Sequence, residues 1–417
     1  MTLIGQKSSY KPSLFLLTLM AGLPQIGETI YSPALPSIAS DLDVSHSLIE
    51  TTLTIYLVGF AVGVLFWGRM ADQKGRKPIM LTGFLLYCIG SLGCLVAPSF
   101  WILFACRFIQ SFGGSVGSVI TQTIARDAFE GKDRAFAFST VAIALSFSPV
   151  IGPVIGGFLD DFWGWRTIFF ALFLSGFFLE FYIYKSLKET RPLETHGARF
   201  LTILPKMIKD PVVLSFGILV GGFNGLLFVF IAEGPFYLID LLGIRPSLYG
   251  IFLFFTALSF ALGSAISRIL LRRGFLEKNL ILTGCILCLL SSLVLLIFAY
   301  CGLISPDFGI FAPFFVLGPM IGIFFGMAFG MALCLSHALK HYFYAAGTAG
   351  ALFGGFYYII IAGLTCLMAV FHSGSVYPMP WIFVAVTVIM MIVSKKIIYP
   401  HFSEEERVLL IKSKSSL

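Results

Sequence analysis

Residues 310–335 read IFAPFFVLGPMIGIFFGMAFGMALCL, a run without a single charged side chain. An α-helix needs about 20 consecutive, mainly apolar residues to cross the hydrocarbon core of a bilayer. Glycine recurs at every fourth position from Gly318 to Gly330, so one side of this helix presents a ridge of small residues on which a neighbouring helix can pack closely. The run therefore predicts a membrane-spanning helix that packs tightly on another helix.

Runs of the same kind fill most of the chain. Apolar residues make up 58% of the 417 positions and charged residues 12%, and the mean hydropathy is +0.94. Soluble domains carry about 25% charged residues, and transmembrane β-barrels show short alternating segments, which are absent from this sequence. The sequence therefore predicts an all-α polytopic membrane protein with twelve spans, at 14–36, 48–70, 79–97, 100–124, 136–158, 167–184, 212–237, 248–270, 279–300, 310–335, 345–370 and 379–395.

Lysine and arginine are distributed unevenly among the connections between these spans. If both chain ends lie on one side of the membrane, 25 of the 28 basic residues fall on that side. Only Arg166 and Arg245 fall on the opposite side, and Arg107 lies inside a span. Basic residues accumulate in cytoplasmic connections, so we expect a multi-pass protein of the cell inner (cytoplasmic) membrane with both termini in the cytoplasm. The same rule accounts for the net charge of +7 without a nucleic-acid partner.

The longest polar connection divides the chain into two similar halves. We expect a six-helix bundle at 1–190, a cytoplasmic linker at 191–210, a second six-helix bundle at 211–400 and a cytoplasmic tail at 401–417. At an offset of 198 the run from Gly152 to Gly157 matches the run from Gly350 to Gly355. Two parallel, pseudo-symmetric six-helix halves are the repeat plan of a large class of transporters, which hold substrate between the halves near the middle of the membrane.

A charged loop, GRMADQKGRKP at 68–78, connects the second and third spans. Gly75 permits the tight turn that so short a loop requires. Asp72 and Asp127 each stand at the C-terminal end of a predicted span, where the helix dipole disfavours an anion by about 0.3–1 kcal/mol. Topology signalling alone would explain the basic residues but not these acids. We therefore expect a cytoplasmic gate that holds the halves together in one state, built from Gly68, Asp72, Gly75, Arg76, Lys77, Arg126 and Asp127.

These motifs carry a resemblance to a known family. The 68–78 loop and the run from Arg107 to Gly114 are similar to the loop and fourth-span signatures of the major facilitator superfamily. The motif associated with its antiporters is similar to the stretch that contains Gly152, Pro153, Gly156 and Gly157. The Bcr/CflA drug-resistance branch is similar at 31–36, 126–127 and 165–166. The resemblance implies the major facilitator fold and export of drugs or metabolites in exchange for protons.

Arg107 is the most costly residue to place in a membrane. A lone cation inside a span costs about 2.5–3.5 kcal/mol, so it should face the protein interior and find a partner. Glu28, the acid well inside the first span, is the natural partner. A carboxyl group whose distance from an arginine changes between two states binds protons differently in each, which is what proton coupling requires. A purely structural role for either residue is the alternative. The branch often carries Asp where Thr29 stands here, about 100° around the helix from Glu28.

Further polar and aromatic residues inside the spans are candidates for a substrate pocket, although each is also compatible with simple packing. They are Gln25, Tyr31, Tyr56, Gln110, Asn224, Glu233, Tyr357 and Tyr358. We expect no metal site and no cofactor. His337 and His341 have helical spacing but lack an acidic third ligand, and the sequence contains no phosphate-binding loop.

The leading hypothesis is a monomeric secondary transporter that exports a small organic compound in exchange for protons by alternating access. The substrate would be a drug, a toxin or a siderophore-like metabolite, and the partners would be that substrate, protons and the lipid bilayer. A proton-coupled importer of a charged nutrient, bound by Glu28 and Arg107, is the alternative within the same fold. An integral membrane enzyme or a sensor is a third hypothesis, but the sequence shows no catalytic constellation or sizeable soluble domain for it.

Overall fold

The computed structural model describes residues 10–191 and 200–402. Within these residues twelve helices are long and apolar enough to cross a membrane, and each coincides with one predicted span. The predicted all-α polytopic architecture is confirmed. The boundaries differ most for the span predicted at 136–158, which is part of a helix that runs from Gly131 to Trp163.

The first half of the chain forms one bundle. Its long helices are α1 (Leu14–Thr29), α3 (His46–Lys74), α4 (Arg76–Leu95), α5 (Phe100–Ala128), α6 (Gly131–Trp163) and α7 (Arg166–Ser186). A 3-10 turn (Ser32–Ala34) joins α1 to the short helix α2 (Leu35–Asp41). Glycines make the tight turns that the short loops require: Gly75 has a φ of +103° between α3 and α4, and Gly164 has a φ of +81° between α6 and α7.

The second half forms a similar bundle. Its helices are α9 (Pro211–Pro235), α10 (Pro246–Arg272), α11 (Glu277–Tyr300), α12 (Ala312–Ala338), α13 (Ala346–Phe371) and α14 (Pro378–Val393). A π-helical segment (Phe236–Leu241) extends α9. Helix α8 (Phe200–Ile208) precedes the bundle, and Ile203 and Met207 on one of its faces are buried. The rest of the expected linker lies partly outside the described residues, as does most of the expected tail.

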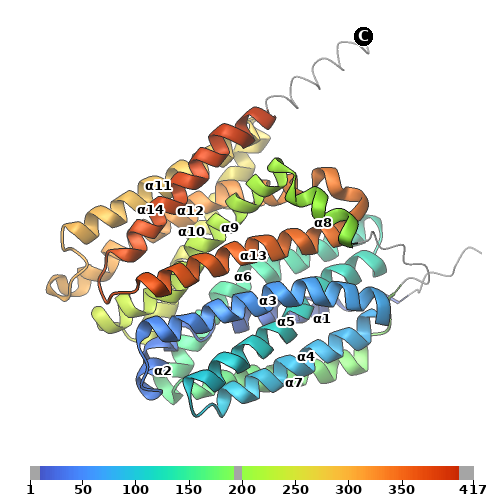
Figure 1. Ribbon diagram of the computed structural model, residues 1–417, viewed down its shortest axis with the longest axis horizontal. Helices are drawn as coiled ribbons and strands as arrows, with labels where there is room; N and C mark the ends of the chain where they lie inside the picture. Colours follow the sequence, from blue (N-terminus) through green and yellow to red (C-terminus); the bar gives the residue numbers. More distant parts are fainter. Residues whose placement is uncertain (1–9, 192–199, 403–417) are drawn as a thin grey trace, which may run out of the picture.

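The two halves lie side by side along their length, with α3 against α13 and α6 against α10. The described chain ends, Tyr10 and Phe402, lie at the same end of the molecule (Figure 1). We call this the terminal end, and we call the opposite end, which holds Asp41 and Phe371, the distal end.

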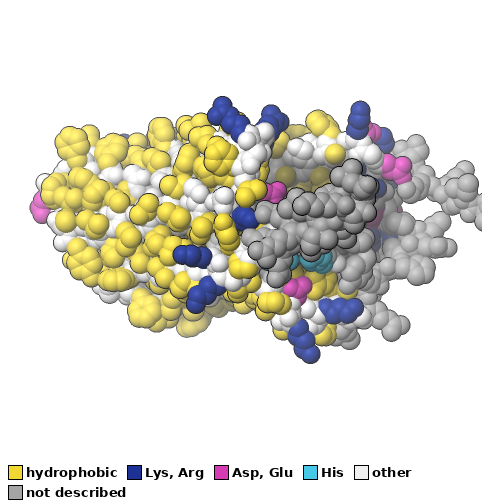
Figure 2. All heavy atoms as spheres, turned by 90° about the horizontal axis from the view of Figure 1, so that it is seen from above, with side chains coloured by type: hydrophobic (Ala, Val, Ile, Leu, Met, Phe, Trp, Pro, Cys, Tyr) yellow, Lys and Arg dark blue, Asp and Glu magenta, His cyan; other side chains and the backbone are white. Residues whose placement is uncertain are grey.

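The outer surface fits a hydrocarbon environment. Hydrophobic side chains cover most of the face seen in Figure 2, and lysine and arginine side chains gather toward the terminal end. Trp101, Phe178 and Ile310 expose between 61% and 78% of their surface. Large apolar side chains with this exposure, on helices of this length, are explained by contact with lipid.

The glycine ridge of α12 is partly as predicted. A Cβ atom on Gly326 would lie 2.9 Å from the Gly284 carbonyl oxygen of α11, and one on Gly330 would lie 2.7 Å from the Phe223 ring of α9. Gly318 instead has no atom within 4 Å of such a position. The ridge therefore permits close packing along its middle and its C-terminal part and not along the whole helix.

Candidate functional site

The glycine motif of α6 brings this helix unusually close to two neighbours. A Cβ atom on Gly152 would lie 3.0 Å from the Ile26 carbonyl oxygen of α1, and one on Gly156 would overlap the Ile30 carbonyl group. Gly157 faces the second half of the molecule, where a Cβ atom would overlap the Pro246 carbonyl oxygen of α10. Helix α6 therefore packs backbone against backbone on both sides.

The contact between α6 and α10 is reciprocal. A Cβ atom on Gly250 of α10 would lie 2.6 Å from the carbonyl oxygen of Pro153 in α6. Each helix thus supplies a glycine where the other presents its backbone. Small residues allow this approach because they place no side chain between the two helices.

Arg107 of α5 is fully buried in the first half. Its guanidinium carbon lies 3.9 Å from the ring centre of Tyr31 and 4.1 Å from that of Tyr56, distances typical of cation–π contacts. Its Nη1 atom donates to the carbonyl oxygen of Gly27 (3.1 Å) and to Oε1 of Gln110 (2.5 Å). The predicted inward orientation of Arg107 is thus what the structure shows, and aromatic rings and amide oxygens hold the charge.

The residues around Arg107 are themselves fixed by hydrogen bonds. The Tyr31 hydroxyl lies 3.1 Å from the hydroxyl of Thr52, and the Tyr56 hydroxyl donates to the carbonyl oxygen of Pro24 at 2.9 Å. The Gln110 amide donates to the Ser91 hydroxyl at 2.8 Å. Tyr31, Tyr56 and Gln110, which we considered as pocket residues, therefore surround Arg107 in this structure.

Glu28 of α1 is fully buried, and neither of its carboxylate oxygens has a hydrogen-bond partner among the described residues. It acts on Arg107 electrostatically, but the structure gives no direct ion pair between these two described side chains. It also lies near Tyr357 and Tyr358 of α13, close enough to interact with them electrostatically when ionised. Glu28 thus lies where the first half meets the second.

The neighbouring position on α1 faces elsewhere. The Thr29 hydroxyl donates to the carbonyl oxygen of Pro149 in α6 at 3.0 Å. An acid at position 29 would therefore face α6, whereas Glu28 lies near the tyrosines of α13. The two positions are not equivalent places for a carboxyl group.

The remaining pocket candidates fall into three places. Gln25 donates to the Tyr358 hydroxyl across the two halves at 3.4 Å, and Tyr357 stacks on Tyr358 with ring centres 5.1 Å apart. Asn224 donates to a carbonyl oxygen of its own helix. Glu233 lies apart from these residues at the distal end.

The charge cluster at the terminal end is built inside the first half. Arg76 is buried and lies 3.0 Å from a carboxylate oxygen of Asp72 and 3.0 Å from one of Asp127. Glu189, just after α7, accepts from the backbone amides of Arg76 (2.8 Å) and Lys77 (3.2 Å) at the start of α4. An acid at a helix N-terminus is favoured by the helix dipole.

Glu189 could not be predicted as a member of this cluster, because nothing near it in the sequence indicates that it meets α4. Of the other expected gate residues, Arg126 approaches the second half, because a Cβ atom on Gly347 would lie 2.9 Å from its Nη1 atom. Gly68 makes an ordinary contact with Val119.

Hydrogen bonds join the two halves at the distal end. Ser32 donates to the carbonyl oxygen of Ile231 at 2.6 Å, and Ser47 donates to that of Ala369 at 2.6 Å. Ser247 of α10 donates to Asp161 of α6 at 2.7 Å. The distal end is closed in this structure.

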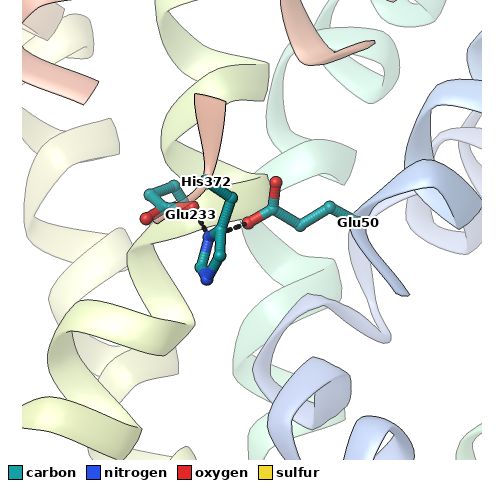
Figure 3. A group of neighbouring side chains, drawn as sticks. All are labelled: Glu50, Glu233 and His372. Atoms are coloured by element: carbon teal, nitrogen blue, oxygen red, sulfur yellow. Dashed lines mark hydrogen bonds and ion pairs between the residues drawn. The ribbon is translucent and has the colours of Figure 1, made fainter. Parts of the chain in front are cut away.

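A histidine between two carboxylates completes this closure (Figure 3). Nδ1 of His372, just after α13, lies 2.8 Å from Glu233 of α9 and 3.1 Å from Glu50 of α3. Burial lowers the pKa of His372, but the hydrogen bond to Glu233 and the interaction with Glu50 more than offset this and raise the pKa to about 10. Glu50 was not among the residues considered from the sequence.

A family model described as Major Facilitator Superfamily matches residues 17–365. An uncharacterized transporter of Rickettsia felis is 32% identical over 375 residues, which cover 88% of this chain and 91% of the relative. Multidrug resistance protein D of Escherichia coli is 29% identical, covering 87% of this chain and 90% of the relative. A bicyclomycin resistance protein homolog of Haemophilus influenzae is 28% identical, covering 90% and 92%.

Solved structures share the architecture. The crystal structure of a D-xylose-proton symporter aligns with a TM-score of 0.71 at 15% identity, covering 92% of this chain and 96% of that one. At this identity the likeness shows the fold alone.

Proposed function

The chain belongs to the major facilitator superfamily, as its motifs predict, and on this premise we propose that it exports a small organic compound in exchange for protons by alternating access. It is a multi-pass membrane transporter and not an enzyme. Two relatives named for resistance to drugs and to bicyclomycin support a drug, toxin or metabolite as the substrate.

The observation that carries the proposal is the state of Glu28. A fully buried carboxylate without a hydrogen-bond donor is strongly destabilised, so Glu28 holds a proton in this arrangement. Arg107 is near enough to act on its charge, and Tyr31, Tyr56 and Gly27 hold the guanidinium in place. A change in their separation, or entry of water, then releases the proton.

Closure at the distal end supports alternating access. Ser32, Ser47 and Ser247 each hydrogen-bond across the two halves there. With 25 of 28 basic residues on the side of the termini, the terminal end faces the cytoplasm and the distal end faces outward. Opening the distal end breaks these bonds and exposes the region of Glu28 to the outside, where substrate leaves and a proton enters.

The substrate occupies the boundary between the halves near Glu28. Gln25, Tyr357 and Tyr358 meet there, so the site offers an amide and two aromatic surfaces. Aromatic faces bind organic cations and flat rings without demanding one shape. Protonation of Glu28 removes its charge from this place and weakens the binding of a cationic substrate.

Proton release on ligand binding tests the proposal. Purified protein in weakly buffered detergent solution is mixed with ethidium, an aromatic cation, or with bicyclomycin, and the pH is recorded. We expect release of about one proton per bound ligand from the wild type and none from Glu28→Gln. Glu180→Gln, which changes a half-buried acid of α7, is the matched control and should behave as the wild type.

Transport distinguishes direction. In vesicles that contain the wild-type protein, an imposed proton gradient should drive the compound against the proton flow. Ligand binding without proton release from either protein contradicts antiport, and movement of compound together with protons favours the importer.

A further inference from the structure

Three side chains with metal-ligand chemistry converge at the distal end from three separate segments (Figure 3). Glu50 comes from the first turns of α3, Glu233 from the last turns of α9, and His372 from the connection after α13. One ligand atom of each lies within 4.8 Å of the others. Glu50 and Glu233 are almost completely buried, and the His372 side chain is 8% exposed.

The three groups do not satisfy one another. Nδ1 of His372 carries at most one hydrogen, and its hydrogen bond goes to Glu233. Both oxygens of Glu50 are buried and have no hydrogen-bond donor among the described residues, although Glu50 points toward the imidazole. A buried carboxylate in this position has to be neutralised, either by a proton or by a bound cation.

We propose that Glu50, Glu233 and His372 form a binding site for a divalent transition-metal ion of the Zn²⁺ class. A divalent ion neutralises both carboxylates, and the neutral imidazole contributes the lone pair of Nδ1. Without the ion, the cluster is neutral only when it holds two protons, one on the imidazole and one on a carboxyl group, and binding of the ion releases both to solvent. The two carboxylates thus supply the charge that the ion requires.

The spacing of the ligand atoms fits such an ion. Zinc binds imidazole nitrogen and carboxylate oxygen at roughly 2.0–2.2 Å, so two ligands of a tetrahedral site lie about 3.4 Å apart. The observed separations from Nδ1 are 2.8 and 3.1 Å, so the side chains need to spread by only a few tenths of an ångström. Mg²⁺ and Ca²⁺ take six or more oxygen ligands and do not match this set.

A water molecule would supply the fourth ligand. His46 lies above His372 with ring centres 5.7 Å apart, and its side chain is 42% exposed. Catalytic zinc sites likewise combine three protein ligands with one water.

Binding of this ion would join the two halves, because Glu50 belongs to the first half and the other two ligands to the second. Bound metal would hold the distal end closed. Inhibition of export by Zn²⁺ follows if the proposed function holds, but metal binding itself does not depend on transport.

Equilibrium dialysis of the purified full-length protein against Zn²⁺ tests the site. After treatment with a chelator, the wild type should bind one Zn²⁺ per chain, and a large excess of Mg²⁺ should not displace it. Glu50→Gln and His372→Asn should each weaken zinc binding by at least about tenfold, since even ligand-supporting residues change metal affinity by about 10–100-fold.

Asp240→Asn is the matched control. Asp240 is a neighbouring acid that pairs with His46 at 3.3 Å and is not one of the three ligands. Each variant is first shown to be monodisperse, which excludes gross misfolding. The use of two independent ligand changes guards further against an effect of misfolding in one of them. Equal zinc binding by the wild type, Glu50→Gln and His372→Asn would overturn the proposal, as would binding lost only in Asp240→Asn.

Discussion

Replacement of Gly156 by alanine should loosen the packing of α6 on α1. The added Cβ atom would overlap the Ile30 carbonyl oxygen and lie 2.7 Å from the Ile30 carbonyl carbon. Both atoms belong to the backbone of α1, so no flexible side chain can move aside. The two helices must separate instead.

The magnitude follows from two opposing effects. Overpacking a well-packed interior costs typically about 1–3 kcal/mol. Alanine inside a helix is favoured over glycine by roughly 0.5–1 kcal/mol. The free energy of unfolding should therefore fall in Gly156→Ala, by about 1 kcal/mol at the middle of the two ranges and by at most about 2.5 kcal/mol.

The internal repeat provides the control. Gly354 of α13 occupies the corresponding position in the second half, and a Cβ atom there would make an ordinary contact of 3.7 Å with Val64. Gly354→Ala should leave the free energy of unfolding unchanged or raise it by up to about 1 kcal/mol. Equilibrium unfolding in mixed micelles with increasing SDS, followed by circular dichroism, measures both. Equal changes in the two variants would refute the reasoning from the contact between α6 and α1.

Three further outcomes are expected. Arg107→Lys should reduce transport at least about tenfold in a vesicle assay, because an ammonium group cannot reproduce the planar stacking of the guanidinium. Asp127→Asn should lower the free energy of unfolding by about 1–3 kcal/mol, since it removes an ion-pair partner of buried Arg76. The control is Asp133→Asn, which removes an exposed ion pair with Lys11 and should change the free energy of unfolding by less than about 1 kcal/mol. Gly157→Ala should separate α6 from α10. In a protein whose own cysteines are replaced by serine and which carries Ser32→Cys, this change should raise the rate at which a thiol reagent labels position 32. An unchanged labelling rate would contradict a closed distal contact at Gly157.

The sequence was sufficient for the helices because crossing a membrane depends on the composition of each segment alone. All twelve spans follow from apolar runs of sufficient length. Helix α6 extends beyond its predicted bounds at 136–158, because its polar ends continue the same hydrogen-bonding pattern outside the apolar run.

The partners of buried groups could not be predicted in the same way. The high cost of a charge in a membrane correctly placed Arg107 inside the protein. Its contacts are two tyrosine rings, a carbonyl and an amide, which come from α1, α3, α5 and the turn that follows α1. The sequence favoured the Glu28 carboxylate as the partner of Arg107, because an opposite charge is the most obvious partner for an arginine. A sequence does not show which aromatic rings will stack on a guanidinium group.

The distal cluster was missed for a related reason. His372 follows a span, Glu50 begins one, and Glu233 ends one, so each has the position of an ordinary residue near a membrane surface. Their convergence depends on how α3, α9 and α13 are arranged in space. Only the tertiary structure brings Glu50, Glu233 and His372 together.

The reciprocal contact at Gly157 and Gly250 has a kinetic consequence. Where bulky side chains interdigitate, relative rotation of two domains requires many rotamers to change together. At these two glycines main chain rests on main chain, and the hydrogen bond from Ser247 to Asp161 is the side-chain link beside them. If the protein works by the proposed alternating access, this contact keeps the two halves aligned and adds little to the activation barrier for their relative rotation.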